Sequence, residues 1–331
     1  MVAADQDTDA SHEARSVDIV RDMEIHFNGS MTLDNGLVVG ADVGTATDLG
    51  DGFDVTDSFV YFSDDWGRVN FGATDGAGYL LQVTAPAVDG NYDGMDQYYT
   101  PFNADVTGVT QLASIEFDYD HDMSTPHDKV TYISPLWNGF QMGVSYTPEA
   151  KTSRGLNGVS AQGDEDNLEN IWDIAGRFGN DVSWGSYTIG AGYSHADNED
   201  GVGAGASDPS DDRTLWNLGL DLNIGAWGLG AVYTHDDRGE LGGSASDQRQ
   251  WIVGADYTHG DMVYAASYLN QNNEFGANDI DTQRYTGGVT WKYGPGIDFT
   301  GLVTHIDHDV DAALGDDVSG TALMLGTAIS F

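Results

Sequence analysis

Residues 214–236, TLWNLGLDLNIGAWGLGAVYTHD, alternate between bulky apolar and small or polar side chains. A period of two is the period of a β-strand, whose successive side chains point to opposite faces. Gly225 marks a short turn near the centre, so the stretch predicts a β-hairpin. One face of this hairpin is apolar and the other is polar or bare, which raises the question of which face meets water.

The same pattern recurs along most of the chain and predicts fifteen strands. Short turns that contain Gly, Asn or Asp alternate with long loops rich in Gly, Ser and Asp. Because no linker interrupts this rhythm, we interpret residues 1–331 as a single domain. The predicted strands are 17–33, 37–43, 55–63, 68–74, 128–136, 140–148, 170–178, 184–195, 214–223, 227–236, 248–258, 262–270, 283–293, 297–306 and 318–331.

The apolar faces are unlike the inner faces of a soluble β-protein. Aromatic residues sit at the ends of the apolar runs and aliphatic residues in the middle, as in Trp216, Leu218 and Leu220. The opposite faces, with residues such as Asp221 and Asp256, are too small and too charged to pack as a core. We therefore expect the apolar faces to point outward and the interior of a closed sheet to hold water.

The length of the apolar runs places these faces in a membrane. About ten residues at roughly 3.3 Å each, tilted by about 45°, span on the order of 25 Å, the height of the apolar band of an outer-membrane barrel. Trp and Tyr at both ends would form aromatic girdles at the membrane surfaces. The prediction is an all-β fold, a transmembrane antiparallel β-barrel.

The composition is strongly acidic and narrows the possible partners. The 331 residues include 54 acidic and 12 basic side chains, for a formal net charge of -42. Nucleic acid is excluded as a partner because binding a polyanion requires clustered Lys and Arg. Such acidity is typical of a solvated, halophilic surface, and a negative lumen predicts a preference for cations. The chain has no Cys and no catalytic motif, so we expect no enzyme activity.

Two alternatives come from other classes of protein. The Asp and Gly content also fits a secreted, acidic, calcium-binding adhesin or β-solenoid, which requires a short glycine-rich repeat in place of hairpins. A soluble all-β glycan hydrolase or lectin requires apolar inner faces. A membrane barrel requires detergent to stay in solution, whereas neither alternative does, so this requirement distinguishes them.

Three segments and the last residue resemble the general porins of Gram-negative outer membranes, most closely the alphaproteobacterial type. They are LDNGLVVGADV at 33–43, FVYFSDDWGRVNFGATDGAGY at 59–79, NGFQMGVSYTP at 138–148 and Phe331. The resemblance implies a sixteen-stranded barrel, a homotrimer, and passive diffusion of small hydrophilic solutes and cations. It also implies contact with outer-membrane lipid and lipopolysaccharide, and recognition of Phe331 as an insertion signal by the barrel-insertion machinery.

The even strand number of bacterial barrels leaves one strand unaccounted for. In the family an extra strand precedes the stretch that matches 17–33. We therefore expect residues 1–16 to be a remnant of the first external loop and the native first strand to be missing.

Residues 74–128 form the longest segment without a predicted strand. Loops of this length are commonly functional, and the segment's own aromatic residues, such as Tyr79, favour packing. We expect it to be the third loop of the family, folded into the lumen as a constriction, although any single Asp in it is equally well explained as a turn cap. The predicted acidic constriction residues are Asp75, Asp89, Asp93, Asp96 and Asp105. The basic wall that the resemblance implies would consist of Arg68, Lys129, Arg177, Arg284 and Lys292.

The sequence EFDYDHD at 116–122 alternates carboxylates that could bind calcium. The candidate ligands are Glu116, Asp118, Asp120 and Asp122. The stretch lacks the EF-hand pattern, so a solvated acidic loop is the alternative, and no other cofactor is expected.

Overall fold

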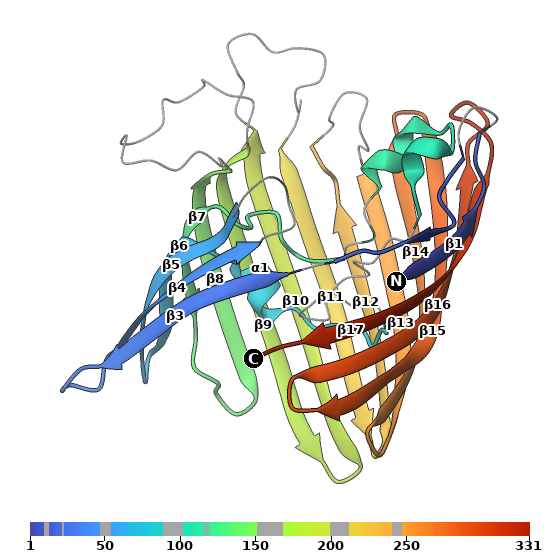
Figure 1. The fold of residues 1–331 in the computed structure, drawn as a ribbon. Helices are drawn as coiled ribbons and strands as arrows, with labels where there is room; N and C mark the ends of the chain where they lie inside the picture. Colours follow the sequence, from blue (N-terminus) through green and yellow to red (C-terminus); the bar gives the residue numbers. More distant parts are fainter. Residues whose placement is uncertain are drawn as a thin grey trace.

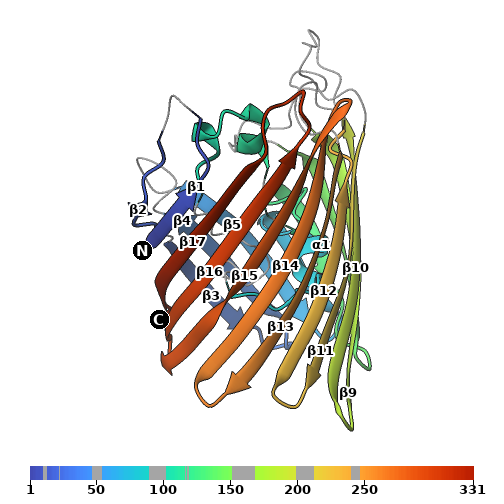
Figure 2. The same ribbon diagram turned by 90° about the vertical axis from the view of Figure 1, so that its right-hand side faces the viewer.

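The protein forms one sheet of seventeen strands that curls around a central space (Figures 1 and 2). This computed structural model describes residues 1–9, 13–21, 23–46, 54–88, 102–115, 117, 119–150, 168–198, 212–239 and 247–331. No helix in these ranges has the length and hydropathy of a membrane span. The predicted all-β class and antiparallel barrel are confirmed.

The elements follow one another in chain order with little helix. The strands are β1 Val2–Gln6, β2 Val17–Asp18, β3 Glu24–Thr32, β4 Val38–Ala46, β5 Asp54–Asp64, β6 Gly67–Ala73, β7 Asp128–Ile133, β8 Phe140–Glu149, β9 Leu168–Val182, β10 Gly185–Asn198, β11 Arg213–Ile224, β12 Trp227–Asp236, β13 Asp247–His259, β14 Met262–Phe275, β15 Asn278–Gly294, β16 Ile297–Val310 and β17 Val318–Ile329. The helices are α1 Ala77–Leu81 and the 3-10 turns η1 Ala104–Val106 and η2 Thr110–Ser114.

Each strand from β3 to β16 pairs antiparallel with the next one along the chain. In the hairpin that opened the sequence analysis, Leu220 lies opposite Ala231 and Asp221 opposite Gly230. Register therefore keeps apolar residues beside apolar ones. A shift of one residue would turn Asp221 toward the membrane.

The expectation that the first strand is missing and that residues 1–16 are a loop is wrong. Val2–Gln6 forms β1, which pairs antiparallel with Met324–Gly320 of β17. The fifteen strands from β3 to β17 together with β1 make the sixteen that the family resemblance implied, and the two-residue β2 pairs with β1. The sequence VAADQ of β1 has no apolar alternation, so its pattern did not reveal a strand.

The apolar faces point outward, as predicted from their alternation. Trp216 is 39% exposed and Leu218 is 52% exposed, whereas the intervening Asn217 is only 4% exposed. Two rows of ring contacts follow the outward faces. At the end of the long loops the pairs include Trp216–Tyr233, Trp251–Tyr268 and Tyr268–Tyr285, and at the end of the short turns Trp227–Tyr257, Trp291–Tyr293 and Trp291–Phe299. These rows lie where the sequence placed the aromatic girdles.

Candidate pore and its inner loop

The first part of the long segment, residues 74–88, lies against the inward-facing wall. The short helix α1 lies inside the sheet (Figure 1) and packs against β7, β8, β9 and β10. Its Ala77 and Leu81 are buried. The backbone N–H of Ala77 donates a hydrogen bond of 2.7 Å to the buried Ser145 Oγ on β8. Contacts of this kind attach the helix to the wall.

A groove of wall glycines holds the chain that follows α1. A Cβ placed on Gly190 would lie 2.6 Å from Val83 Cγ2, and one on Gly219 would lie 2.5 Å from the Val83 carbonyl oxygen. On the next strands, a Cβ on Gly254 would lie 1.8 Å from the Pro86 carbonyl oxygen. Contacts below 3.0 Å leave no room for a side chain. These inward glycines, Gly190, Gly219, Gly230 and Gly254, form what we call the glycine groove, which runs across β10–β13.

A buried polar cluster fixes the returning part of the segment to β9 and β10. His121 Nε2 lies 2.5 Å from Ser194 Oγ, and Ser194 Oγ in turn donates to Asp173 Oδ1. Ser124 Oγ donates to the other Asp173 oxygen over 2.7 Å. Since the Ser194 proton is used by Asp173, His121 is the donor to Ser194. All four side chains are at most 1% exposed, and we call them the polar latch.

Burial keeps the imidazole of His121 neutral. Desolvation lowers the pKa of His121 to about 4, against the opposing attraction of the Asp173 and Asp236 carboxylates. Its neighbour Asp120 accepts a 2.8 Å hydrogen bond from Gln82, so the outgoing and returning parts of the segment are also tied to each other. The loop is therefore held to the wall by side chains from both of its halves.

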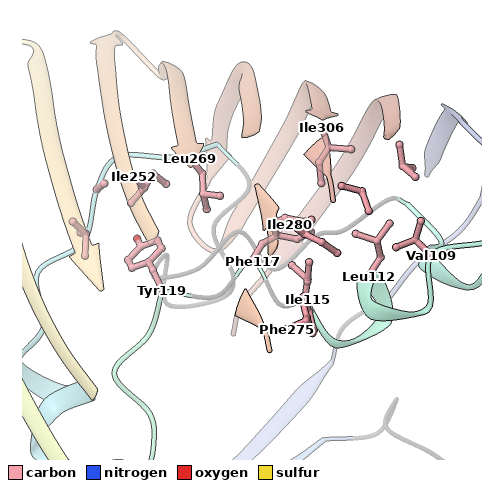
Figure 3. Packing of buried hydrophobic residues seen from close by; sticks show 14 residues of the cluster. Val109, Leu112, Ile115, Phe117, Tyr119, Ile252, Leu269, Phe275, Ile280 and Ile306 are labelled. Atoms are coloured by element: carbon pink, nitrogen blue, oxygen red, sulfur yellow. The ribbon is translucent and has the colours of Figure 1, made fainter. Parts of the chain in front are cut away.

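The loop side chains Val109, Leu112, Ile115, Phe117 and Tyr119 pack against apolar residues on the inner face of β13–β16, as Figure 3 shows. Ile252, Leu269 and Ile306 are at most 2% exposed and occupy inward positions that the alternation assigns to the polar side. Sequence reasoning missed this patch because its partners, among them Leu112 and Phe117, come from a distant part of the chain. The inner wall is thus apolar where the loop covers it.

The N-terminal strand also holds the loop. The Gln6 amide exchanges two hydrogen bonds with the Asn103 backbone, of 2.8 and 2.7 Å. The Asp9 backbone N–H donates to the Val106 carbonyl over 2.8 Å. The turn η1 is therefore bound to Gln6, which pairs with β17, and to Asp9 just beyond β1.

Two of the predicted basic wall residues lie under the loop and away from the lumen. Arg284 is 0% exposed, and its guanidinium lies 5.3 Å from the centre of the Phe117 ring. Lys129 is 4% exposed, and its Nζ donates to the carbonyls of Thr74 and His127. Their position identifies them as anchors of the loop.

Two other predicted basic residues, Arg68 and Arg177, line a cavity of about 750 Å³ between α1 and β3–β9. Arg68 lies over the Tyr61 ring at 3.9 Å and donates to Asn70 over 2.6 Å, while Arg177 donates to Gln141. Asp75 of the loop lines the same cavity. Four carboxylates that sequence reasoning did not single out line it too: Asp42, Asp57, Asp64 and Asp65.

The remaining predicted residues are dispersed. Asp105 lies exposed in η1, beside the N-terminal residues, and Lys292 is exposed on β15 opposite Asp298. The C-terminal Phe331 is exposed beyond the end of β17, and its role as an insertion signal stays a prediction. Three predicted constriction residues lie outside the described residues: Asp89, Asp93 and Asp96.

Of the proposed calcium ligands, Glu116 and Asp118 lie outside the described residues. Asp120 and Asp122 line a small space together with Arg213 and Arg238. Arg213 forms an ion pair with Asp236, which also faces this space. These guanidinium groups supply positive charge that a bound cation would otherwise provide.

A model of the Gram-negative porin family matches residues 2–311. The chain belongs to this family. The resemblance noted in the sequence is thereby confirmed, and with it the outer membrane as the location and an outer-membrane porin channel as the function. Membership of this family does not favour the alternative hypothesis of a secreted, calcium-binding adhesin.

Solved structures of porins share the fold at low sequence identity. An anion-selective porin from Comamonas acidovorans is 17% identical, with 93% of this chain and 89% of that one covered and a TM-score of 0.62. OmpF of Salmonella typhi is 14% identical with 99% and 95% covered and a TM-score of 0.60. A mutant of the Rh. blastica porin is 15% identical with 99% of each chain covered and a TM-score of 0.56.

One curated relative matches over a short stretch. An uncharacterized protein of Rickettsia conorii is 23% identical over 116 residues, which is 31% of this chain and 26% of that protein. The matched stretch therefore spans about a quarter of that relative's length.

Proposed function

We propose that this porin forms a water-filled channel for passive diffusion of small hydrophilic solutes and inorganic ions, with a preference for cations. One observation supports this proposal above the others: among the described residues, the cavity beside α1 is lined by five Asp and two Arg. Carboxylates that line a water-filled passage raise the local cation concentration. Residues 74–88 supply the constriction, and Asp75 lines the same cavity as the guanidinium groups of Arg68 and Arg177.

The ion preference is tested by the zero-current potential of the reconstituted channel in a planar bilayer with a KCl gradient. A potential of the sign set by K⁺ diffusion is the expected result. The sign set by Cl⁻ would refute the preference and leave the channel intact, whereas a lack of conductance would refute the channel itself.

Neutralising carboxylates of the cavity is expected to reduce this preference. The double change Asp42→Asn and Asp57→Asn removes two of the five negative charges, so the potential should move toward the anion side. The double change Asp34→Asn and Asp261→Asn, in the exposed β3–β4 and β13–β14 turns, removes the same two charges away from the cavity and serves as the control. Equal shifts in both variants would mean that overall charge, and not the cavity, sets selectivity.

We further propose that the outward faces of β3–β5 contact other copies of the chain in a homotrimer. The outward residues of these strands include no Trp or Tyr among those described, in contrast to the girdles of β9–β15. They nevertheless expose Phe27 and Met31 at 67% and 65%. Girdle residues mark contact with lipid headgroups, so a face without them fits contact with protein.

Phe27→Ala is expected to weaken the trimer by about 1 kcal/mol or more per subunit, because it removes a large apolar contact. Unheated gel electrophoresis over a temperature series measures the midpoint of trimer dissociation. Ile174→Ala, on the outward face of β9, truncates a residue that is also exposed, at 57%, and should leave this midpoint unchanged. An unchanged midpoint in Phe27→Ala would place the interface elsewhere.

The remaining outward face would then lie in outer-membrane lipid, with lipopolysaccharide at the end of the long loops. The alternating apolar residues at the end of β17, Leu323, Leu325 and Ile329, support a role for the last strand and Phe331 in recognition by the insertion machinery. Phe331→Ala would lower the yield of folded barrel in the outer membrane if this role holds.

A further inference from the structure

Three metal-ligating side chains meet at the outer ends of β10 and β11, away from the lumen. His195, Asp197 and Asp212 place one ligand atom each within 4.8 Å of the others. His195 Nε2 lies 3.3 Å from Asp197 Oδ1. Ser194 and Ala196 are buried on the inner side, so His195 and Asp197 share the outward side just beyond the aromatic row.

The register brings two of these carboxylates face to face. Ala196 pairs with Arg213, so the next position in the antiparallel ladder puts Asp197 opposite Asp212. Like charges directly opposite each other on neighbouring strands destabilise a sheet. In a chain with a net charge of -42, a cation bound between the two carboxylates would offset this repulsion.

Hydrogen bonds orient both carboxylates. Asn170 Nδ2 donates to Asp197 Oδ2 over 3.1 Å, and the Tyr146 hydroxyl donates to Asn170 Oδ1 over 3.0 Å. Asn170 is the extra residue of a bulge in β9 and has a φ of 50°, a backbone conformation that turns its amide toward Asp197. The backbone N–H of Asn198 donates to Asp212 Oδ1 over 3.2 Å. Partners of this kind characterise the surroundings of metal ligands.

We propose that His195, Asp197 and Asp212 bind one divalent transition-metal ion, of which Zn²⁺ is the representative. One imidazole nitrogen and two carboxylate oxygens match the ligand preference of Zn²⁺, whereas Ca²⁺ and Mg²⁺ prefer oxygen alone. Water completes a four-coordinate ion. The ion links β10 to β11 at the base of the loop that joins them, and the site is independent of the channel function.

The test is titration of the metal-free, purified full chain in detergent with Zn²⁺, followed by calorimetry. Excess Mg²⁺ is present throughout to occupy the diffusely acidic surface. One saturable equivalent per chain is expected. His195→Gln and Asp212→Asn should each weaken binding at least about tenfold. His259→Gln, at the opposite end of the barrel and stacked on Tyr257, should bind like the unmodified protein.

X-ray absorption of the zinc-loaded protein supplies the second measurement, with one imidazole and an oxygen shell expected. Gel mobility before and after heating verifies that each variant is a folded barrel. The proposal is overturned if no saturable equivalent survives Mg²⁺, if His195→Gln binds as tightly as the unmodified chain, or if the bound zinc has no imidazole. In the first of these cases, His195 and Asp197 form an ion pair only.

Discussion

Gly254→Ala is expected to destabilise the barrel by about 1–3 kcal/mol and to lower its single-channel conductance. The new Cβ would lie 1.8 Å from the Pro86 carbonyl oxygen, which is far inside van der Waals contact. The strand β13 is hydrogen-bonded to β12 on one side and to β14 on the other, so its backbone cannot move away from Pro86. The loop segment moves instead, and the only free direction is toward the lumen.

The control for this variant is Gly326→Ala. Gly326 is also an inward glycine, on β17, but a Cβ there would meet nothing within 4 Å. Conductance in planar bilayers and the denaturant midpoint of the refolded protein report the two effects. If both variants behave alike, loss of backbone flexibility and not the glycine groove explains the result. An increase in conductance would show that the loop leaves the wall altogether.

The second prediction is that acid weakens the attachment of the loop to the wall. The expected loss is about 3 kcal/mol in the free energy of docking. His121 is neutral when buried, with its pKa lowered from 6.5 to about 4. Below pH 6.5 the released form binds a proton that the docked form does not, which favours release. The polar latch therefore keeps its full strength above pH 6.5 and loses it progressively as the pH falls to about 4.

Hydrogen exchange of residues 117 and 119–125, corrected for the intrinsic pH dependence, measures loop opening between pH 7.5 and pH 4. His121→Gln keeps a donor for Ser194 but cannot titrate, so its opening should depend much less on pH. If the variant and the unmodified protein show the same dependence, the titrating group lies elsewhere, and the polar latch is not the acid-sensitive element.

The sidedness of the barrel was predictable because it is a local property. Alternation at Trp216, Asn217 and Leu218 assigns each side chain to a face whatever the rest of the chain does. The strand β1 was not predictable in this way, since its five small and polar residues have no such alternation. Its assignment comes from pairing with β17, at the other end of the sequence.

The sequence indicated that charged side chains of the inner wall and of the long loop line the pore. It did not indicate which of these residues reach the lumen. Arg68 and Arg284 have the same inward parity, yet Arg68 lines the cavity and Arg284 is buried beneath Phe117. The path of the loop makes this difference, and that path depends on contacts between residues far apart in the sequence. In the same way, nothing near Gly254 in the sequence indicates that Pro86 approaches it.

The polar latch was also not predictable, because it depends on contacts between residues far apart in the sequence. His121 of the loop lies 73 positions before Ser194 in the sequence, and Ser194 lies directly opposite Asp173 in the β9–β10 hairpin. A lone His in an acidic loop gave no sign of a buried partner, and we interpreted the surrounding residues as possible calcium ligands. Docking of the loop on the inner face of the β9–β10 hairpin brings them together.

The strand β1 joins the two ends of the sequence, with the Met1 amino group donating to the carbonyl of Leu325, 324 residues away. A contact of such long range is among the last to form, because nearly the whole chain must be ordered before it compensates for the entropy lost. The same short segment also binds η1 through hydrogen bonds from Gln6 and Asp9. Pairing with β17 and the docking of η1 thus depend on the same short segment, so a barrel assembled without β1 would leave η1 undocked while α1 and the polar latch stay on the wall.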